Sequence, residues 1–164
     1  MCGISNSVEF GEPALRLLID SESRVKRFLD HGADPSVTGE QASPLATAAL
    51  EPLCGVFDTL ISHGADLDLY ALFKAMTPRG RGGIPDINDL TDRGIDINVV
   101  RPEYGTPLHY AITSGTEAKE KLELLLQRGG DRIVKNTYVL TPAELAQKKG
   151  HLDVFDFLLG DVWS

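Results

Sequence analysis

Two copies of one tetrapeptide, His-Gly-Ala-Asp, begin 32 residues apart, at His31–Asp34 and His63–Asp66. Looser copies follow at Arg93–Asp96 and Arg128–Asp131, so the spacing stays between 30 and 35 residues. A fixed spacing of this size indicates a repeat architecture, in which each repeat is one small unit of supersecondary structure. The sequence therefore predicts a chain of stacked short units rather than one irregular core.

A Ser-Pro or Thr-Pro pair stands before several of these glycines, at Ser43–Pro44, Thr106–Pro107 and Thr141–Pro142. Ser and Thr cap helix N-termini, and proline is tolerated at the first helical position. The glycine after the second apolar stretch suits the left-handed conformation that ends a helix. One such helix pair cannot bury its own apolar face, so neighbouring pairs must stack. We therefore predict an all-α fold of helix–turn–helix units.

Two stretches carry the most specific pattern, Gly105–Ala111 (GTPLHYA) and Thr141–Leu152 (TPAELAQKKGHL). Together with the Gly-Ala-Asp copies, they resemble the ankyrin-repeat family. The resemblance covers the chain from about Pro13 onward. It implies a solenoid of stacked helix–turn–helix units joined by short β-hairpin fingers.

The glycine positions divide the chain into a lead-in that caps the N-terminus and five repeats. The third repeat is degenerate, because Ala71 stands in its proline slot only seven residues after Gly64. That distance is 12 or 13 residues elsewhere, so we expect this repeat to lack most of its finger. The expected lead-in is residues 1–11, the repeat domain is 12–164, and its repeats are 12–37, 38–69, 70–100, 101–135 and 136–164.

Charge and composition exclude several classes of protein. The formal net charge is −8, with 16 Lys and Arg against 24 Asp and Glu, which disfavours a nucleic-acid binder that relies on phosphate contacts. Two cysteines cannot build a disulfide framework, and no apolar run approaches the roughly 18 residues of a membrane span. Since the N-terminus resembles no secretory signal, we expect a cytoplasmic protein, with the nucleus left open. We expect no cofactor, no metal and a monomer by default.

The resemblance implies that fingers and inner helices form a concave groove, so candidate contacts stand at positions the repeat template leaves free. These positions combine an acidic end, apolar or aromatic anchors and a basic end, which is typical of a protein-binding surface. We predict an adaptor that binds a protein or peptide and has no catalysis of its own. The candidate residues are Glu40, Leu50, Glu51, Pro102, Glu103, Tyr104, Thr113, Ser114, Tyr138, Leu140, Lys148 and Lys149.

An enzyme built in the same groove is the alternative. Its acid–base residues would be Glu103, Tyr104, His109 and Tyr138. Against it, the sequence shows no nucleophile, metal set or phosphate loop at a characteristic spacing. The resemblance also implies that His109 bonds adjacent backbone and orders the finger. An enclosed pocket with converging polar groups would favour the enzyme, and an open surface the binding module.

Asn98 is a candidate modification site. The spacing of Leu90, Asp96 and Asn98 resembles that in substrates of the ankyrin-directed asparaginyl hydroxylase. Turn geometry explains an asparagine in this slot equally well, because Asn side chains readily bond nearby backbone. Both interpretations stay open at the level of sequence.

Overall fold

The computed structural model describes residues 19, 21–36, 43–50, 54–77, 83–114 and 117–160. Within these ranges nine helices alternate with turns, and one isolated β-bridge joins Arg101 to Gly105. Helices that follow one another in the chain pack in pairs, consistent with ankyrin helix–turn–helix stacks. The predicted all-α class is confirmed.

The chain divides into two compact units. Unit 1 comprises Met1–Ala75 and Arg79–Leu90, and unit 2 comprises Met76–Pro78 and Thr91–Ser164. Each unit has its own buried apolar side chains, so each is a packed helix stack in its own right.

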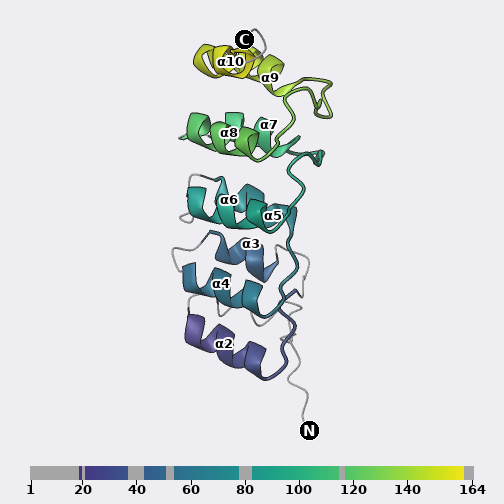
Figure 1. The fold of residues 1–164 in the computed structure, drawn as a ribbon. Coiled ribbons are helices and arrows are strands. Elements are labelled where there is room, and N and C mark those ends of the chain that lie inside the picture. The colour runs from purple at the N-terminus through teal and green to yellow at the C-terminus, as the bar shows by residue number, and fades with distance from the viewer. Residues whose placement is uncertain are drawn as a thin grey trace. The chain divides into compact units, whose positions relative to one another are not determined.

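Unit 1 contains the first five described helices. Helix α3 packs against both α4 and α5, and α2 packs against α4 (Figure 1). The last two residues of α6 belong to unit 2. The helices are α2 (Glu22–Asp30), α3 (Pro44–Ala48), α4 (Cys54–Ser62), α5 (Leu69–Ala75) and α6 (Gly83–Asp92).

A buried carboxyl group lies in unit 1 beside the apolar core. Asp86 is only 8% exposed. Its pKa is raised to about 6, first by burial and then by the nearby charges of Asp58 and Asp89. Burial disfavours the charged form of a carboxyl group, so this side chain opposes the stability of unit 1 once it ionises. The buried apolar residues of unit 1 include Leu45, Ala46, Val56, Phe57, Leu60, Leu72, Ile87 and Leu90.

The third repeat begins its first helix directly after the preceding turn. Asp68 caps α5, because its Oδ1 accepts a hydrogen bond from the Ala71 backbone N–H at 2.8 Å. The Ser43 hydroxyl donates to the other carboxylate oxygen of Asp68. In the repeats of unit 2 the capping residue stands after a finger, whereas here it stands three residues after Ala65. The described chain therefore has no room for a finger between Ala65 and α5.

Unit 2 contains two complete helix pairs. Helix α7 packs against α8 and α9, and α9 packs against α10. A capping box starts α9, in which Thr141 and Glu144 exchange side-chain and backbone hydrogen bonds. Gly150, at φ +78°, ends the same helix. The helices are α7 (Pro107–Thr113), α8 (Ala118–Gln127), α9 (Pro142–Lys149) and α10 (Leu152–Leu159).

Lys121 on α8 is a buried cation with a defined partner. Its side chain is 2% exposed, and its ammonium donates to the Met76 carbonyl at 2.9 Å. Burial lowers the pKa of this amine, while the Glu117 carboxylate, 3.9 Å away, opposes that shift. The interaction joins the two chain segments that make up unit 2.

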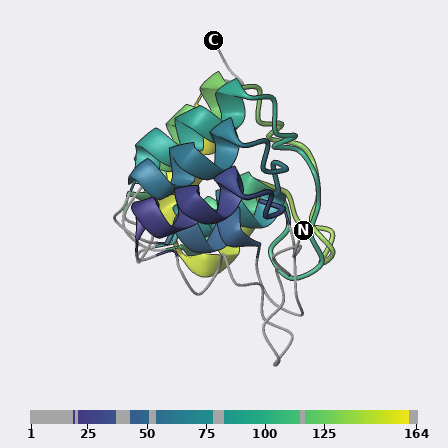
Figure 2. The ribbon, with the colours of Figure 1, turned by 90° about the horizontal axis from the view of Figure 1, so that it is seen from below.

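The turns and fingers of unit 2 lie to one side of its helices, as the view along the helix stack shows (Figure 2). Among the described residues, no helix is long and apolar enough to cross a membrane.

Candidate functional site

Finger four, residues 101–105, is a tight hairpin that leads into α7. The Arg101 N–H donates to the Gly105 carbonyl at 2.9 Å, and the Gly105 N–H donates to the Arg101 carbonyl at 2.7 Å. Tyr104 lies edge-on against Tyr110 of α7, with ring centroids 5.1 Å apart and an angle of 76° between the planes. Edge-to-face aromatic pairs are favourable, so the finger is held against its own helix.

Finger five, residues 136–140, closes a loop of the same length with a side-chain clamp. The Asn136 N–H donates to the Leu140 carbonyl at 2.9 Å. The Asn136 Oδ1 accepts from the Tyr138 N–H at 2.9 Å and from the Leu140 N–H at 3.1 Å. Asn side chains stabilise turns through such local bonds, so the fingertip has a fixed shape.

His109 at the start of α7 links both fingers. Its Nδ1 lies 3.2 Å from the Thr106 backbone nitrogen and 2.8 Å from the Thr106 hydroxyl. Its Nε2 lies 2.8 Å from the Leu140 carbonyl at the base of finger five. Because a carbonyl can only accept, we infer that the proton is on Nε2 and that Nδ1 accepts from Thr106. The predicted role of His109 in ordering the finger agrees with this geometry.

The environment of His109 favours the neutral ring. The side chain is completely buried, and burial lowers its pKa, opposed by the hydrogen bond to Leu140. A second link joins the fingertips, because the Thr137 hydroxyl donates to the Pro102 carbonyl at 3.1 Å. Fingers four and five are thus connected at base and tip.

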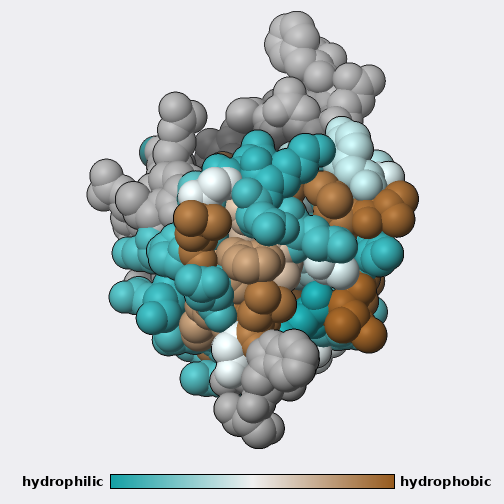
Figure 3. Space-filling view, turned by 90° about the horizontal axis from the view of Figure 1, so that it is seen from above, coloured by the Kyte–Doolittle hydropathy of each residue, from teal (hydrophilic) through white to brown (hydrophobic). Residues whose placement is uncertain are grey.

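Exposed apolar side chains gather on the finger side of unit 2. Tyr138 is 77% exposed, Val139 66% and Ile133 76%, while Val99, Val100 and Tyr104 are between 36% and 39% exposed. The end-on view of the last repeat shows hydrophobic atoms in several places, including the right, where the fingers of unit 2 lie (Figure 3). Such a patch on a rigid support marks a place where another molecule can dock.

Most predicted contact residues of the fourth and fifth repeats belong to this surface or to the adjoining inner helices. Those with exposed side chains are Pro102, Glu103, Tyr104, Thr113, Tyr138, Lys148 and Lys149, and Leu140 is half-buried.

Ser114 is a predicted contact residue of unit 2 that does not join this surface. Ser114 is buried, and its hydroxyl donates to the Ala111 carbonyl at 3.1 Å, so it cannot present a side chain to a partner. Leu50 is half-buried in unit 1. Glu40 and Glu51 lie outside the described residues.

The predicted acid–base set does not form a catalytic arrangement. Both ring nitrogens of His109 are occupied and the ring is buried, whereas Glu103 and Tyr138 are exposed on different fingers. A hollow of about 310 Å³ lies over α8 and α10, and its lining includes none of the four residues. In the described part of the chain, no three His, Cys, Asp or Glu side chains are grouped to hold a metal ion.

Asn98 connects two turns of unit 2. Its N–H donates to Asp96 Oδ1 at 2.9 Å. Its side-chain amide donates to the Gly129 carbonyl at 3.1 Å and accepts from the Asp131 N–H at 2.8 Å. These bonds give the asparagine a structural role of the kind that turn geometry suggests, while its modification stays a prediction.

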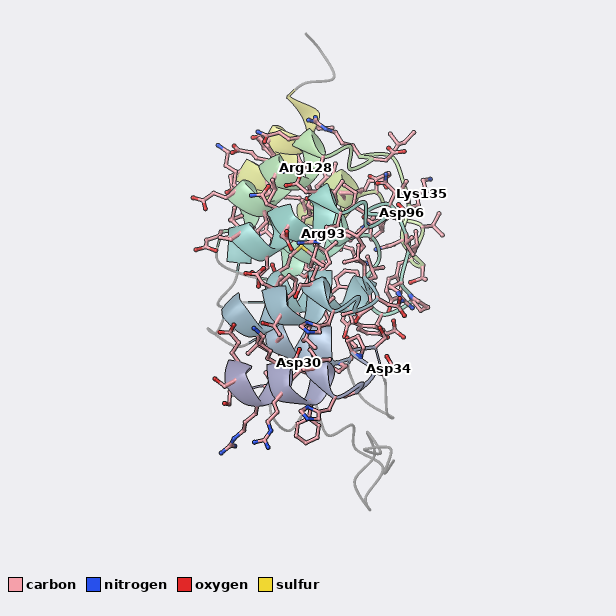
Figure 4. All side chains as sticks on the ribbon, turned by 60° about the horizontal axis from the view of Figure 1, so that its bottom comes forward. Asp30, Asp34, Arg93, Asp96, Arg128 and Lys135 are labelled. Carbon is pink, nitrogen blue, oxygen red and sulfur yellow. The ribbon has the colours of Figure 1, made fainter. Side chains whose placement is uncertain are left out.

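Three exposed residues on the finger side were absent from the predicted set: Ile133, Lys135 and Val139. Figure 4 shows Lys135 at the edge of unit 2 where the fingers lie, apart from Arg128. The basic, exposed Lys135 directly before finger five could have been chosen from sequence. Nothing in the sequence marks Val139, whose backbone conformation depends on the clamp by Asn136.

The comparisons with known proteins agree with ankyrin-type repeats over part of the chain. No family model matches it. Over 58 residues, 35% of its length, the chain is 41% identical to Ankyrin repeat and IBR domain-containing protein 1 of Homo sapiens. Its similarity to the Mus musculus protein of the same name has the same extent. The matched segment makes up 5% of each of these proteins, so the chain corresponds to a small part of them.

Proposed function

We propose that the chain is a protein- or peptide-binding module, and that unit 2 carries a binding surface on fingers four and five and the exposed side of α9. Fold alone does not determine function, so the proposal rests on the site. The observation that carries it is Tyr138, which is 77% exposed on a fingertip fixed by Asn136. A rigid aromatic side chain offers contact area with little loss of conformational entropy.

The open form of this surface supports binding rather than catalysis. The buried and fully bonded His109 cannot contact a substrate held between the exposed side chains. The proposal therefore keeps an adaptor role without chemistry of its own, in the cytoplasm. The proposal also keeps Asn98 as a candidate modification site and Leu50 as a candidate partner contact in unit 1.

Capture from a native lysate with the full chain as bait tests the proposal. The Tyr104→Ala/Tyr138→Ala variant should lose at least tenfold of the signal of the captured proteins, as expected when central aromatic anchors are removed. Glu123→Gln, on the exposed side of α8, is the matched control and should capture as the wild type does. Circular dichroism and thermal melting verify the fold of each variant. Equal capture by folded wild type and double variant would contradict the proposed surface.

A further inference from the structure

Val139 at the tip of finger five has a strained backbone. Its φ is +62°, in the left-handed region, where Glu117 is the only other non-glycine among the described residues. A β-branched residue is a rare outlier there, because its Cβ lies too close to the following carbonyl oxygen. Strain of this kind persists only where surrounding interactions determine it, and it clusters at functional sites.

The hydrogen bonds of finger five hold this conformation. The Val139 N–H donates to the Asn136 carbonyl at 2.9 Å, and Asn136 Oδ1 holds the residues on either side, Tyr138 and Leu140. Val139 nevertheless remains 66% exposed, so the strain is not offset by burial of its side chain. In this structure the strained conformation places an apolar side chain in solvent beside an aromatic one.

Exposed lysines stand directly before finger five and at the end of α9, although the whole chain is acidic. Lys148 and Lys149, in the last turn of α9, are exposed and form no ion pair with any described residue. Lys135 is also exposed and lies near enough to Glu144 to contribute to its lowered pKa. The Glu144 carboxylate is itself bonded to the N–H and hydroxyl of Thr141.

Two further acidic residues of unit 2 stand close to the fingers in the chain. The Asp131 carboxylate accepts from the Ile133 N–H at 2.9 Å and so serves its own turn. Glu103, exposed on finger four, is the acidic side chain that remains at the fingertips. An acidic partner is therefore directed away from finger four and toward α9.

Resting on the proposed function, we propose that finger five and α9 recognise an acidic peptide segment that carries an aromatic or aliphatic side chain. The apolar side chain packs against Tyr138 and Val139, and the carboxylates face Lys135, Lys148 and Lys149. Val139 is a partner-contacting residue, and its left-handed backbone positions it for that contact.

Selection of peptides from a displayed library of random 12-residue sequences tests this inference. The full chain is the bait, and we expect the selected pool to be enriched in Asp and Glu together with Phe, Trp, Leu or Ile. For a selected synthetic peptide, Tyr138→Ala should raise Kd at least tenfold. Val139→Ala should raise it about threefold to tenfold, and Val139→Ile should leave it nearly unchanged.

Charge reversal at the α9 lysines is the second part of the experiment, and it tests the preference for acidic peptides. Lys148→Glu/Lys149→Glu should weaken the same peptide about tenfold at low salt, and its own selection should favour Lys and Arg. Lys26→Glu/Arg27→Glu, exposed on α2 of unit 1, lowers the net charge by the same amount and is the control, which should preserve the acidic preference. Melting curves verify the fold of each variant, because lysines in a last helical turn also favour the helix itself.

The outcomes separate the two claims. Finger-dependent peptides with no acidic preference, or an unchanged preference after charge reversal, would overturn the inference and leave the proposed function standing. Peptides that bind equally well to Tyr138→Ala would contradict the proposed function as well. Equal binding by Val139→Ala and wild type would remove Val139 from the contact.

Discussion

Fingers four and five of unit 2 close loops of equal length, but they place different residues in the left-handed conformation. In finger four it is Gly105, at φ +74°, and in finger five it is Val139, at φ +62°. Glycine adopts such angles without a steric penalty, whereas valine does not. One finger is therefore relaxed and the other strained, although both belong to the same hydrogen-bonded assembly.

Packing explains the relaxed finger. A Cβ on Gly105 would lie 2.9 Å from the Cβ and Cγ of His109 and 3.0 Å from the Cβ of Asn136, so the finger can approach α7 only without a side chain there. Val139 has no comparable packing role, since it is largely exposed. The comparison indicates that finger four is shaped by the contacts it buries, and finger five by the side chains it presents.

The largest effect should come from Gly105→Ala. It adds backbone strain and a clash with His109, so we expect the free energy of unfolding to fall by about 3 kcal/mol. Gly129→Ala is the control, because Gly129 has a similar φ of +89° but open space around its Cβ position. That variant should lose only about 1 kcal/mol in chemical denaturation. Equal losses would mean that packing against His109 does not shape finger four.

His109→Leu should have the next largest effect. It removes the hydrogen bonds that join both fingers and leaves the Leu140 carbonyl without its donor, so we expect a loss of about 2 kcal/mol at pH 7. A loss below about half a kcal/mol in urea denaturation would contradict the bracing role of His109.

The same variant should change the pH dependence of stability. Because burial lowers the pKa of His109 below 6.5, the unfolded chain binds this proton at a higher pH than the folded chain. The stability that neutral His109 contributes is therefore full above pH 6.5, and it is lost as the pH falls through the lowered pKa of the folded state. His109→Leu should abolish this acid-side loss.

Asp86 in unit 1 acts in the opposite direction. Its pKa is raised from 3.8 to about 6, so between these pH values the folded chain keeps a proton that the unfolded chain has lost. Acidification through that window stabilises unit 1. Measuring unfolding from pH 4 to 8 in wild type, His109→Leu, Asp86→Asn and the double variant separates the two groups.

Asn136→Ala should have a smaller effect, confined to finger five. It removes the bonds to the backbone N–H groups of Tyr138 and Leu140, which together contribute about 1–2 kcal/mol. The exposed tip allows water to replace part of that loss. Amide hydrogen exchange should accelerate in residues 137–140 and stay unchanged in residues 101–105. Acceleration of both segments alike would show that the Asn136 clamp supports finger four as well, through the link between Thr137 and Pro102.

Local signals made the fold predictable from the sequence. The Gly-Ala-Asp and Thr-Pro copies specify caps and turns over a few residues, and the short spacing from Gly64 to Ala71 predicted the missing third finger. Tertiary interactions placed the residues that sequence could not. Lys121 lies in an amphipathic helix, and its burial depends on the Met76 carbonyl, 45 positions earlier, which accepts a hydrogen bond from its ammonium. Ser114 was predicted to contact a partner, but its side chain is buried and its hydroxyl donates to the Ala111 carbonyl.

The candidate site was predictable only in part. Tyr104, Tyr138 and the two lysines of α9 follow from template positions that must face solvent. Val139 could not be found in this way, because valine favours extended backbone and only the Asn136 clamp explains its positive φ. The bonds from the Asn136 side chain to Tyr138 and Leu140 leave no trace in residue propensities or in hydrophobic periodicity, so sequence analysis does not detect them.

The most direct test of the contrast between the fingers is the unfolding free energy of two matched glycine variants, Val139→Gly and Tyr104→Gly. These positions correspond in the two fingers, but only Val139 has a positive φ among them. Relief of about 1–2 kcal/mol of strain outweighs the roughly 0.5–1 kcal/mol of added entropy in the unfolded chain, so Val139→Gly should be at least as stable as wild type. Tyr104→Gly should be less stable by about 1–2 kcal/mol, since it loses the contact with Tyr110 and gains chain entropy in the unfolded state. A Val139→Gly variant that is destabilised as much as Tyr104→Gly would contradict the claim that the backbone of finger five is strained at Val139.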